Sequence, residues 1–204
     1  MKADAKNYTK HLRAVLSECA RTVVPLYHPL GFVSCVLPSP ENGIILRVHY
    51  WPKEGRREKA PGWPVHTHNF RLSSFVMSGE IRNRNYVEID GPGPGPGLER
   101  NVYKVEYEGE HSRIVDTGRV LRVEVGSDSI HSAGMGYCVE RGVFHESVVP
   151  VGEMVVTLAC LTEKSAIAPL VLGDVSGGSF AYQRESFDSV EFWSVVSDAV
   201  GVIE

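Results

Sequence analysis

Two histidines, His66 and His68, stand two positions apart in this chain, and a third, His145, follows much later. Side chains two positions apart on an extended strand project from the same face. The pair would therefore point toward one place, where an imidazole from a distant strand completes a set of three nitrogens. Imidazole binds iron, zinc, copper and nickel, and three protein ligands leave coordination positions open for a substrate. The alternative is that these are ordinary polar residues of a half-buried strand, so the surrounding sequence has to decide.

Two further residues are candidate catalytic groups. Arg47 would bind a substrate carboxylate through two parallel hydrogen bonds if it points inward, and is an ordinary surface arginine if it points outward. Tyr137 is a candidate proton donor in the pocket, with core packing as the alternative. His49 shares a strand face with Arg47, and we interpret it as a core or rim residue rather than a ligand. Glu146 directly follows His145, so it points the opposite way and is a poor ligand.

The composition is that of one globular domain. The chain has 204 residues, 43% of them hydrophobic, with a formal net charge of −4 at pH 7 and a pI of about 6.1. This charge argues against nucleic acid or an anionic membrane surface as a partner. No signal peptide is expected, because residues 1–10 are polar and no apolar h-region follows. No membrane-spanning segment is expected either, because no run of about 18 apolar residues occurs. The four cysteines lack C-x-x-C spacing and are expected as reduced thiols in a cytoplasmic protein.

Two expected helices flank a long region of short strands. Apolar side chains recur at helical spacing over residues 8–24, and Pro25 ends this helix. A second helix is expected over residues 186–202, with Ser186 as its N-cap. Between them, β-branched runs separated by Gly, Pro and Asn predict strands at 44–51, 71–77, 81–89, 102–107, 120–125, 136–141, 146–149 and 154–161.

This order of elements predicts a mainly β protein, a jelly roll or small barrel with appended helices. The Gly-Pro repeat at residues 91–97 suits neither helix nor sheet and is expected as a loop between strands. We expect an N-terminal helical segment (1–30), a β-barrel (31–170) and a C-terminal extension (171–204) that packs on the barrel. The apolar faces of the two terminal segments also favour a homodimer through one of them.

The stretch around the first two histidines resembles the first sequence motif of the cupins. That motif has two histidines, a strand and a turn glycine, matched here by Gly62, His66, His68 and Gly79. The second cupin motif ends in a histidine after spaced glycines and a proline. At that spacing the chain has Gly134, then Glu140 in place of the proline, Gly142 and His145. The resemblance covers about residues 44–162.

The cupin resemblance implies a double-stranded β-helix whose inward-facing strands carry the metal ligands, here His66, His68 and His145. The chain departs from the family pattern at two places. Most metal-binding cupins have a glutamate four or five residues after the second histidine, where this chain has Leu72 and Ser73. An asparagine usually follows the third histidine, where this chain has Val149. The resemblance therefore implies a ligand set of three histidines without a carboxylate.

A set of three neutral histidines is also what the thiol dioxygenases of the cupin superfamily use. Residues 42–51, a loop and then the histidine pair resemble their strand, tryptophan and loop before the metal site. Those enzymes carry a Ser-His-Tyr relay on a late strand, and residues 157–161 here have neither the His nor the Tyr. The resemblance therefore implies the fold and the metal site but not cysteine as the substrate.

These observations predict a metal-dependent cupin oxygenase or dioxygenase that acts on a small organic metabolite with dioxygen. The expected metal is Fe(II), with zinc, nickel or manganese as substitutes in a purified sample. Three neutral ligands leave up to three adjacent positions on an octahedral ion, where substrate and dioxygen can meet. Two alternatives stay open: a metal-dependent isomerase, lyase or decarboxylase that uses the metal as a Lewis acid, and a non-catalytic small-molecule-binding cupin.

Overall fold

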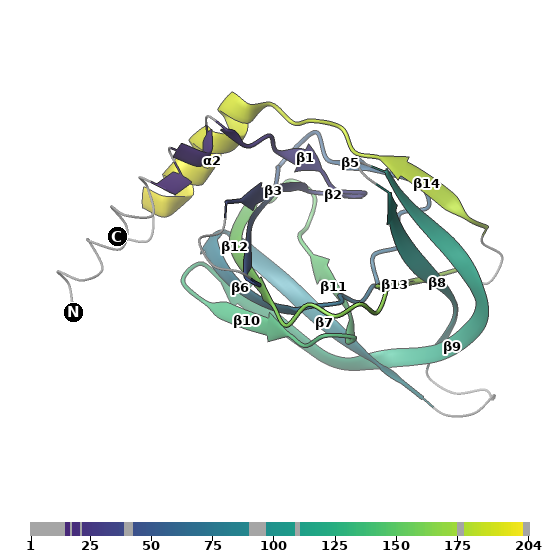
Figure 1. Ribbon diagram of the computed structural model, residues 1–204. Coiled ribbons are helices and arrows are strands. Elements are labelled where there is room, and N and C mark those ends of the chain that lie inside the picture. The colour runs from purple at the N-terminus through teal and green to yellow at the C-terminus, as the bar shows by residue number, and fades with distance from the viewer. Residues whose placement is uncertain are drawn as a thin grey trace.

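The protein is mainly β, with two curled sheets that face each other and a helix at one side (Figure 1). The computed structural model describes residues 15–16, 18–20, 22–38, 43–89, 97–108, 111–174 and 178–201. This architecture confirms the jelly roll with appended helices that the sequence predicts. In the described part of the chain, no helix has both the length and the apolar character needed to cross a bilayer.

The first sheet lies nearest the helices and is antiparallel throughout. Its strands follow the order β1 (Leu26–Tyr27), β3 (Val33–Leu37), β4 (Ile45–Trp51), β12 (Val155–Thr162), β6 (Arg71–Ser78) and β10 (Gly136–Val139). The second sheet has the order β11 (Phe144–Val148), β7 (Glu80–Glu88), β9 (His111–Ser132), β8 (Leu98–Glu108) and β13 (Leu170–Gly173), and β14 (Phe180–Gln183) also pairs with β9. A small separate sheet joins β2 (Leu30–Gly31) to β5 (Arg57–Glu58).

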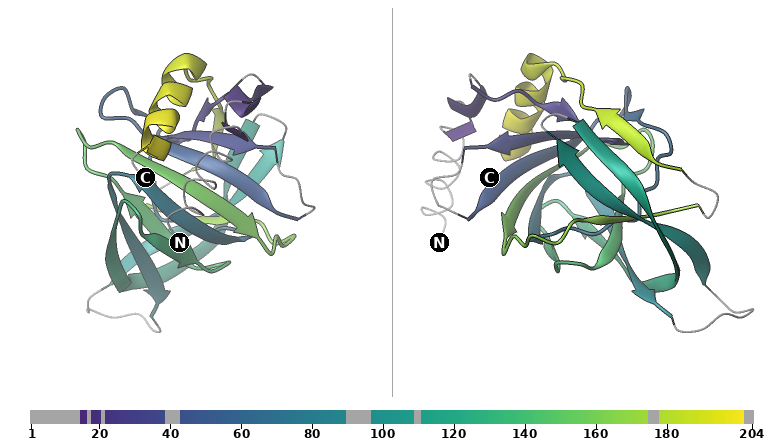
Figure 2. Two further views of the ribbon diagram at one scale, coloured as in Figure 1. Left: turned by 90° about the vertical axis from the view of Figure 1, so that its left-hand side faces the viewer. Right: turned by 45° about the vertical axis from the view of Figure 1, so that its right-hand side comes forward.

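Side chains alternate across the first sheet, so its two faces differ. Val48 and Tyr50 of β4 lie on the outer face, in one apolar cluster with helix α2 (Ser189–Gly201). That helix contributes four buried side chains, Phe192, Val196, Ala199 and Val200. Figure 2 shows the helix lying over this sheet. The apolar face of α2 is therefore used within its own chain, and the homodimer stays a prediction.

Both terminal helices are present, with one correction. In the N-terminal segment, Leu16 and Cys19 are helical and are buried in the same cluster as α2. Residues 8–14 of the expected helix lie outside the described residues. The second helix begins at Ser189, and its N-cap is Asp188, whose carboxylate accepts a hydrogen bond from the Glu191 N–H at 2.8 Å. The prediction that Ser186 caps this helix was wrong, because Ser186 instead forms a bridge with Leu26.

All eight expected strands occur, but the sheets contain more strands, and one longer strand, than the sequence predicts. Residues 120–125 form only the middle of β9, which runs for 22 residues with register shifts against both neighbours. The short strands β1, β2, β3, β5, β13 and β14 were not predicted. β13 and β14 form by pairing with strands that lie far away in the sequence, whereas β1 and β3 pair with near neighbours along the chain. In the expected Gly-Pro loop only Gly97 lies within the described residues.

The turn that the cupin resemblance places at Gly79 is present between β6 and β7. Gly79 has φ of 80°, a backbone conformation that other residues rarely adopt. A Cβ atom at this position would also collide with the Met154 carbonyl oxygen. Glycine is therefore required here twice, for its backbone angle and for the close approach of the neighbouring chain.

Candidate metal centre

The segment that carries His66 and His68 closes the second sheet. His66 forms one bridge to His145 of β11 and another to Val171 of β13, the two edge strands of that sheet. The His66 and His145 backbones exchange two hydrogen bonds, at 3.0 and 2.9 Å. The expected regular strand at this segment is wrong, since only isolated bridges form, but the segment still takes a strand's place between β11 and β13.

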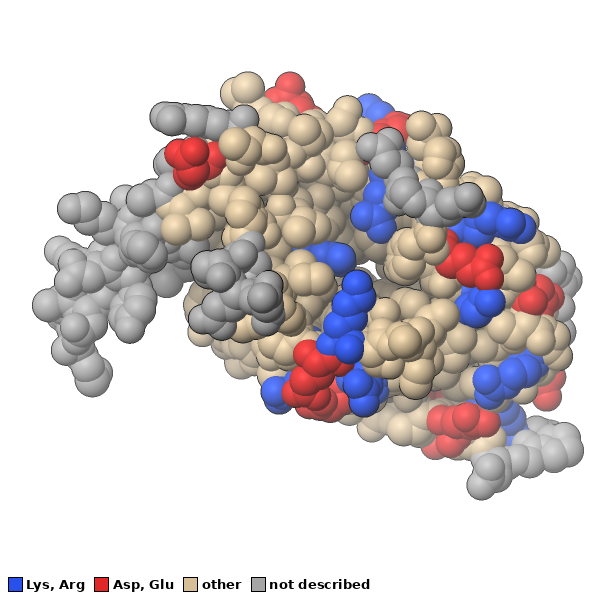
Figure 3. All heavy atoms as spheres, in the orientation of Figure 1, with Lys and Arg blue, Asp and Glu red and all other residues tan. Residues whose placement is uncertain are grey.

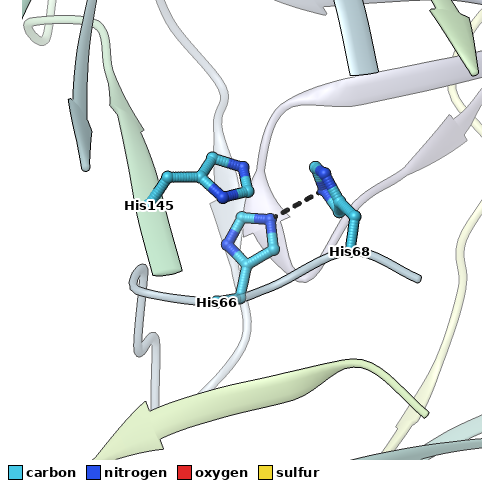
Figure 4. A group of neighbouring side chains, drawn as sticks. All are labelled: His66, His68 and His145. Atoms are coloured by element: carbon cyan, nitrogen blue, oxygen red, sulfur yellow. Dashed lines mark hydrogen bonds between the residues drawn. The ribbon is translucent and has the colours of Figure 1, made fainter. Parts of the chain in front are cut away.

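Alternation along this segment separates the histidines from the residue between them. Thr67 is buried on the opposite side, where its hydroxyl accepts a hydrogen bond from the Leu170 N–H at 2.9 Å. His66 and His68 therefore point together into the interior, as expected from their spacing. His145, almost fully buried, reaches the same point from β11 (Figure 4).

The three imidazoles converge. Nε2 of His66 lies 3.1 Å from Nε2 of His68. The His145 ring centroid lies 4.6 Å from each of the other two rings. One ring nitrogen from each histidine can be chosen so that all three lie within 4.8 Å of one another. Among the described residues, no carboxylate or thiol joins this group.

Hydrogen bonds to the backbone decide which nitrogen of two histidines is free. Nδ1 of His66 lies 2.8 Å from the Pro64 carbonyl oxygen, and Nδ1 of His145 lies 3.0 Å from that of Val143. Because a carbonyl only accepts, each Nδ1 must carry the proton, and each Nε2 keeps its lone pair. His68 is held differently, by stacking on Phe70 with the centroids 4.5 Å apart. Its Nδ1 is buried without a partner.

Burial keeps these imidazoles neutral. It lowers the pKa of His66, and it lowers the pKa of His68 well below the usual value, with His66 adding to the effect. Burial and the nearby His66 lower the pKa of His145 to about 3. All three rings are therefore unprotonated at neutral pH and can donate lone pairs to a metal.

The spacing fits a shared divalent ion. Bonds of about 2.1 Å to adjacent corners of an octahedron would put two nitrogens about 3.0 Å apart. The observed Nε2–Nε2 distance of 3.1 Å between His66 and His68 matches this. Without an ion, Nε2 of His68 can carry a proton and donate it to the lone pair of His66 Nε2 at this distance. The donor set therefore fits a metal, which would replace that hydrogen bond when the His68 proton moves to Nδ1.

The two positions where cupins place a glutamate lie on opposite faces of β6. Leu72 is buried and lines a cavity beside the three histidines. Ser73 faces outward, with its hydroxyl oxygen 3.5 Å from the Cys138 sulfur. Only Leu72 therefore occupies the place of a fourth ligand, and its side chain leaves that place apolar.

Two cavities meet at His66 and His68. The larger, of about 510 Å³, is also lined by Arg47, Phe70, His111, Tyr182 and Arg184. The smaller, of about 270 Å³, is also lined by His49, Trp51, Leu72, Tyr137 and His145. A bound metal would therefore be reachable from two spaces of different character.

Arg47 and Tyr137 lie at the two ends of one row across the inner face of the first sheet. Arg47 is opposite Ala159, Ala159 is opposite Ser74, and Ser74 is opposite Tyr137. With neighbouring strands about 4.8 Å apart, the two ends of the row are separated by about 14 Å. Both residues line cavities at the histidines, but they do so on different sides.

Each of these side chains is suited to a different task. Nε of Arg47 is buried without a hydrogen-bond partner, and its guanidinium lies 5.8 Å from the centre of the Phe70 ring. Burial raises the pKa of Tyr137, against the opposing effect of the neighbouring Ser74 and Ser147. Tyr137 thus holds its proton at neutral pH, while Arg47 has hydrogen-bond donors to spare.

Sequence reasoning missed two groups in this interior. His28 lines the larger cavity and stacks on Phe32 with the centroids 4.3 Å apart. Arg184, just beyond β14, lines the same cavity. Neither lies near the histidine motifs in the chain, so no spacing signal marked them. The expectation for Glu146 is confirmed, since its carboxylate accepts hydrogen bonds from Tyr86 at 2.7 Å and Arg84 at 3.2 Å.

Comparison with known proteins shows only distant likenesses. No protein-family model and no curated protein matches the sequence. Among solved structures, hydroxypropylphosphonic acid epoxidase from S. wedmorenis is 13% identical with a TM-score of 0.41, over 70% of this chain and 56% of that one. Hydroquinone 1,2-dioxygenase PnpCD, in complex with Cd2+ and 4-hydroxybenzonitrile, is 12% identical with a TM-score of 0.35, over 63% of each chain. This chain thus spans less than two thirds of either structure, and neither likeness assigns a family or an activity.

Proposed function

We propose that this protein is a metal-dependent, cupin-type oxygenase that acts on a small organic metabolite, with Fe(II) held by His66, His68 and His145. One observation carries the proposal. Three neutral imidazoles point at one place where two cavities meet, and no carboxylate among the described residues joins them. Three neutral ligands leave the charge of a divalent ion uncompensated and leave positions open for substrate.

Other residues of the chain would bind and orient the substrate and supply a proton. When bound, iron supplies Lewis acidity and the one-electron chemistry that dioxygen needs to react with an organic molecule. Arg47 would bind an acidic group of the substrate through its guanidinium and so fix the orientation of the substrate. Tyr137 would hold a proton at its hydroxyl for transfer from the opposite side. Phe70 lines the larger cavity and Leu72 and Trp51 line the smaller one, so their apolar side chains would limit the water near the reacting atoms.

Metal content tests the proposal first. Protein purified without oxygen should contain about one iron per chain by elemental analysis. Each of His66→Ala, His68→Ala and His145→Ala should lose it and keep the wild-type circular dichroism spectrum. His49→Ala is the matched control, since His49 lines the smaller cavity but is outside the set of three, and it should keep the metal. Metal that stays after loss of His145 would refute the site.

Oxygen consumption tests the reaction class. The iron-loaded protein should consume dioxygen in step with turnover when candidate metabolites are screened, and the His145→Ala variant should not. Turnover without oxygen uptake would instead assign metal-assisted isomerase, lyase or decarboxylase chemistry to the same residues. Stoichiometric metal without turnover across the screen would favour a binding protein.

A further inference from the structure

The larger cavity is lined by positive charge. Among the described residues that line it, four are cationic and none is an aspartate or glutamate. The four are Arg47, Lys59, Lys164 and Arg184. Figure 3 shows a hollow near the middle of the face viewed there, with Lys and Arg side chains beside it. The wall is formed by both sheets, because it includes residues of β4, β8, β9, β13 and β14. A cavity of this size suits a small metabolite rather than a macromolecule.

Most of this charge has no counter-charge among the residues that the structure describes. Lys59 forms an ion pair with Glu185, which also pairs with Arg57 at 2.8 Å. Within the described residues, neither Arg47 nor Arg184 forms an ion pair with a carboxylate. Nε of Arg47 is moreover buried without a hydrogen-bond partner. Two half-buried guanidinium groups are thus left with unused donors.

The two arginines also act on each other. After burial, the largest influence that lowers the pKa of Arg47 is the charge of Arg184. Arginine stays protonated in proteins, so neither group can relieve this repulsion by losing a proton. Partly buried like charges are unfavourable unless something negative lies between or beside them. The arrangement is that of a binding site for an anion from outside the protein.

We propose that the larger cavity binds a small organic dianion, with Arg47 and Arg184 as the residues that hold its anionic end. Two negative charges suit the site better than one, because Lys164 at the rim adds a third positive charge that no carboxylate of the described chain pairs. The anionic end is a phosphoryl or phosphonyl group or a pair of carboxylates. The statement that this dianion is the substrate rests on the proposed function, whereas anion binding itself does not need the metal.

Titration calorimetry with simple probes tests the inference. Methylphosphonate and malonate, which distinguish the two kinds of dianion, are titrated into the protein at fixed ionic strength and at a mildly alkaline pH where both are doubly ionised. Acetate serves as the monoanion. At least one dianion should bind at a single site and more tightly than acetate. Arg47→Gln and Arg184→Gln should each weaken that binding about tenfold or more, since each removes charge-assisted hydrogen bonds. Arg119→Gln is the control, because Arg119 is exposed on β9 and outside the cavity, and it should bind as wild type.

Other outcomes overturn the inference. It fails if neither dianion saturates the protein, if acetate binds as tightly, or if Arg184→Gln binds as well as wild type. Thermal unfolding checks that each variant is folded, and Arg47→Lys, which keeps the charge but loses the paired hydrogen bonds, replaces Arg47→Gln if that variant unfolds. The titrations are run with iron-loaded and chelator-treated protein. If the protein binds a dianion but does not hold stoichiometric metal, the proposed function is refuted and this inference stands. If it holds the metal but binds no dianion, this inference is refuted and the proposed function stands.

Discussion

The two faces of the first sheet use the same strands for different purposes. On the outer face, Val48 and Tyr50 pack with Phe192 of α2 in a continuous apolar core. On the inner face, Arg47 and His49 of the same strand line the cavities at the three histidines. One-residue alternation therefore separates stability from chemistry within β4. Substitutions on the two faces should have separable effects, and the following predictions test that separation.

The largest effect on stability is expected from the outer face. Phe192 is fully buried, and Phe192→Ala should lower the free energy of unfolding by about 3–5 kcal/mol through lost contacts and a cavity. Urea denaturation measures this. The milder Phe192→Leu should cost less than about 1.5 kcal/mol and keep the metal content of wild type. Loss of metal from a folded Phe192→Leu protein would show that the two faces are coupled.

On the inner face, Tyr137→Phe should affect activity far more than stability. If the hydroxyl transfers a proton, its removal should lower kcat about a hundredfold, while metal content stays unchanged. The control is Tyr103→Phe, since Tyr103 is a fully buried tyrosine whose hydroxyl has no hydrogen-bond partner and which lies outside both cavities. Equal losses of activity in the two variants would remove Tyr137 from the mechanism.

Neighbouring positions of β6 give the sharpest comparison. Glu in place of Leu72 would face the histidines, so Leu72→Glu should tighten metal binding roughly tenfold, or about 1.4 kcal/mol. It should also slow turnover, because a carboxylate would fill an open position. Ser73 faces outward, so Ser73→Glu should change neither the metal affinity nor the turnover rate. Competition with a coloured chelator measures the affinity, and identical results for both variants would contradict the assigned faces.

The smallest effect concerns pH. Burial, followed by the charge of Arg47, lowers the pKa of His49 to about 3. The unfolded chain therefore takes up a proton at His49 below about pH 6.5 and the folded protein does not, so stability is lost as pH falls from 6.5 toward 3. Between pH 7 and 5.5 this amounts to about 1 kcal/mol.

His49→Phe should reduce this acid sensitivity without abolishing it, because other buried histidines such as His28 titrate in the same direction. Urea midpoints of chelator-treated protein at pH 7 and 5.5 measure the difference. If the variant loses as much stability between pH 7 and 5.5 as the wild type does, His49 is not held neutral by the fold.

Much of the fold was predictable because local sequence patterns determine where most strands and the helices lie. Alternating β-branched runs marked eight of the strands, and Gly79 marked the turn between β6 and β7. The long β9 and the short β13 and β14 were not predictable in the same way. Their residues become strands only because distant segments offer unpaired N–H and C=O groups.

The candidate site likewise has residues that the sequence identified and residues that only the tertiary structure brought together. The sequence by itself determined that His66 and His68 share a face, because spacing along an extended segment sets which side chains lie together, and the cupin resemblance pointed to His145. Only the tertiary structure decided that Leu72 rather than Ser73 faces them, and that Arg184 comes to lie near Arg47. The physical reason is that a cavity is lined by whichever residues the sheet curvature brings together. Local periodicity records the face of each strand, but not which faces meet.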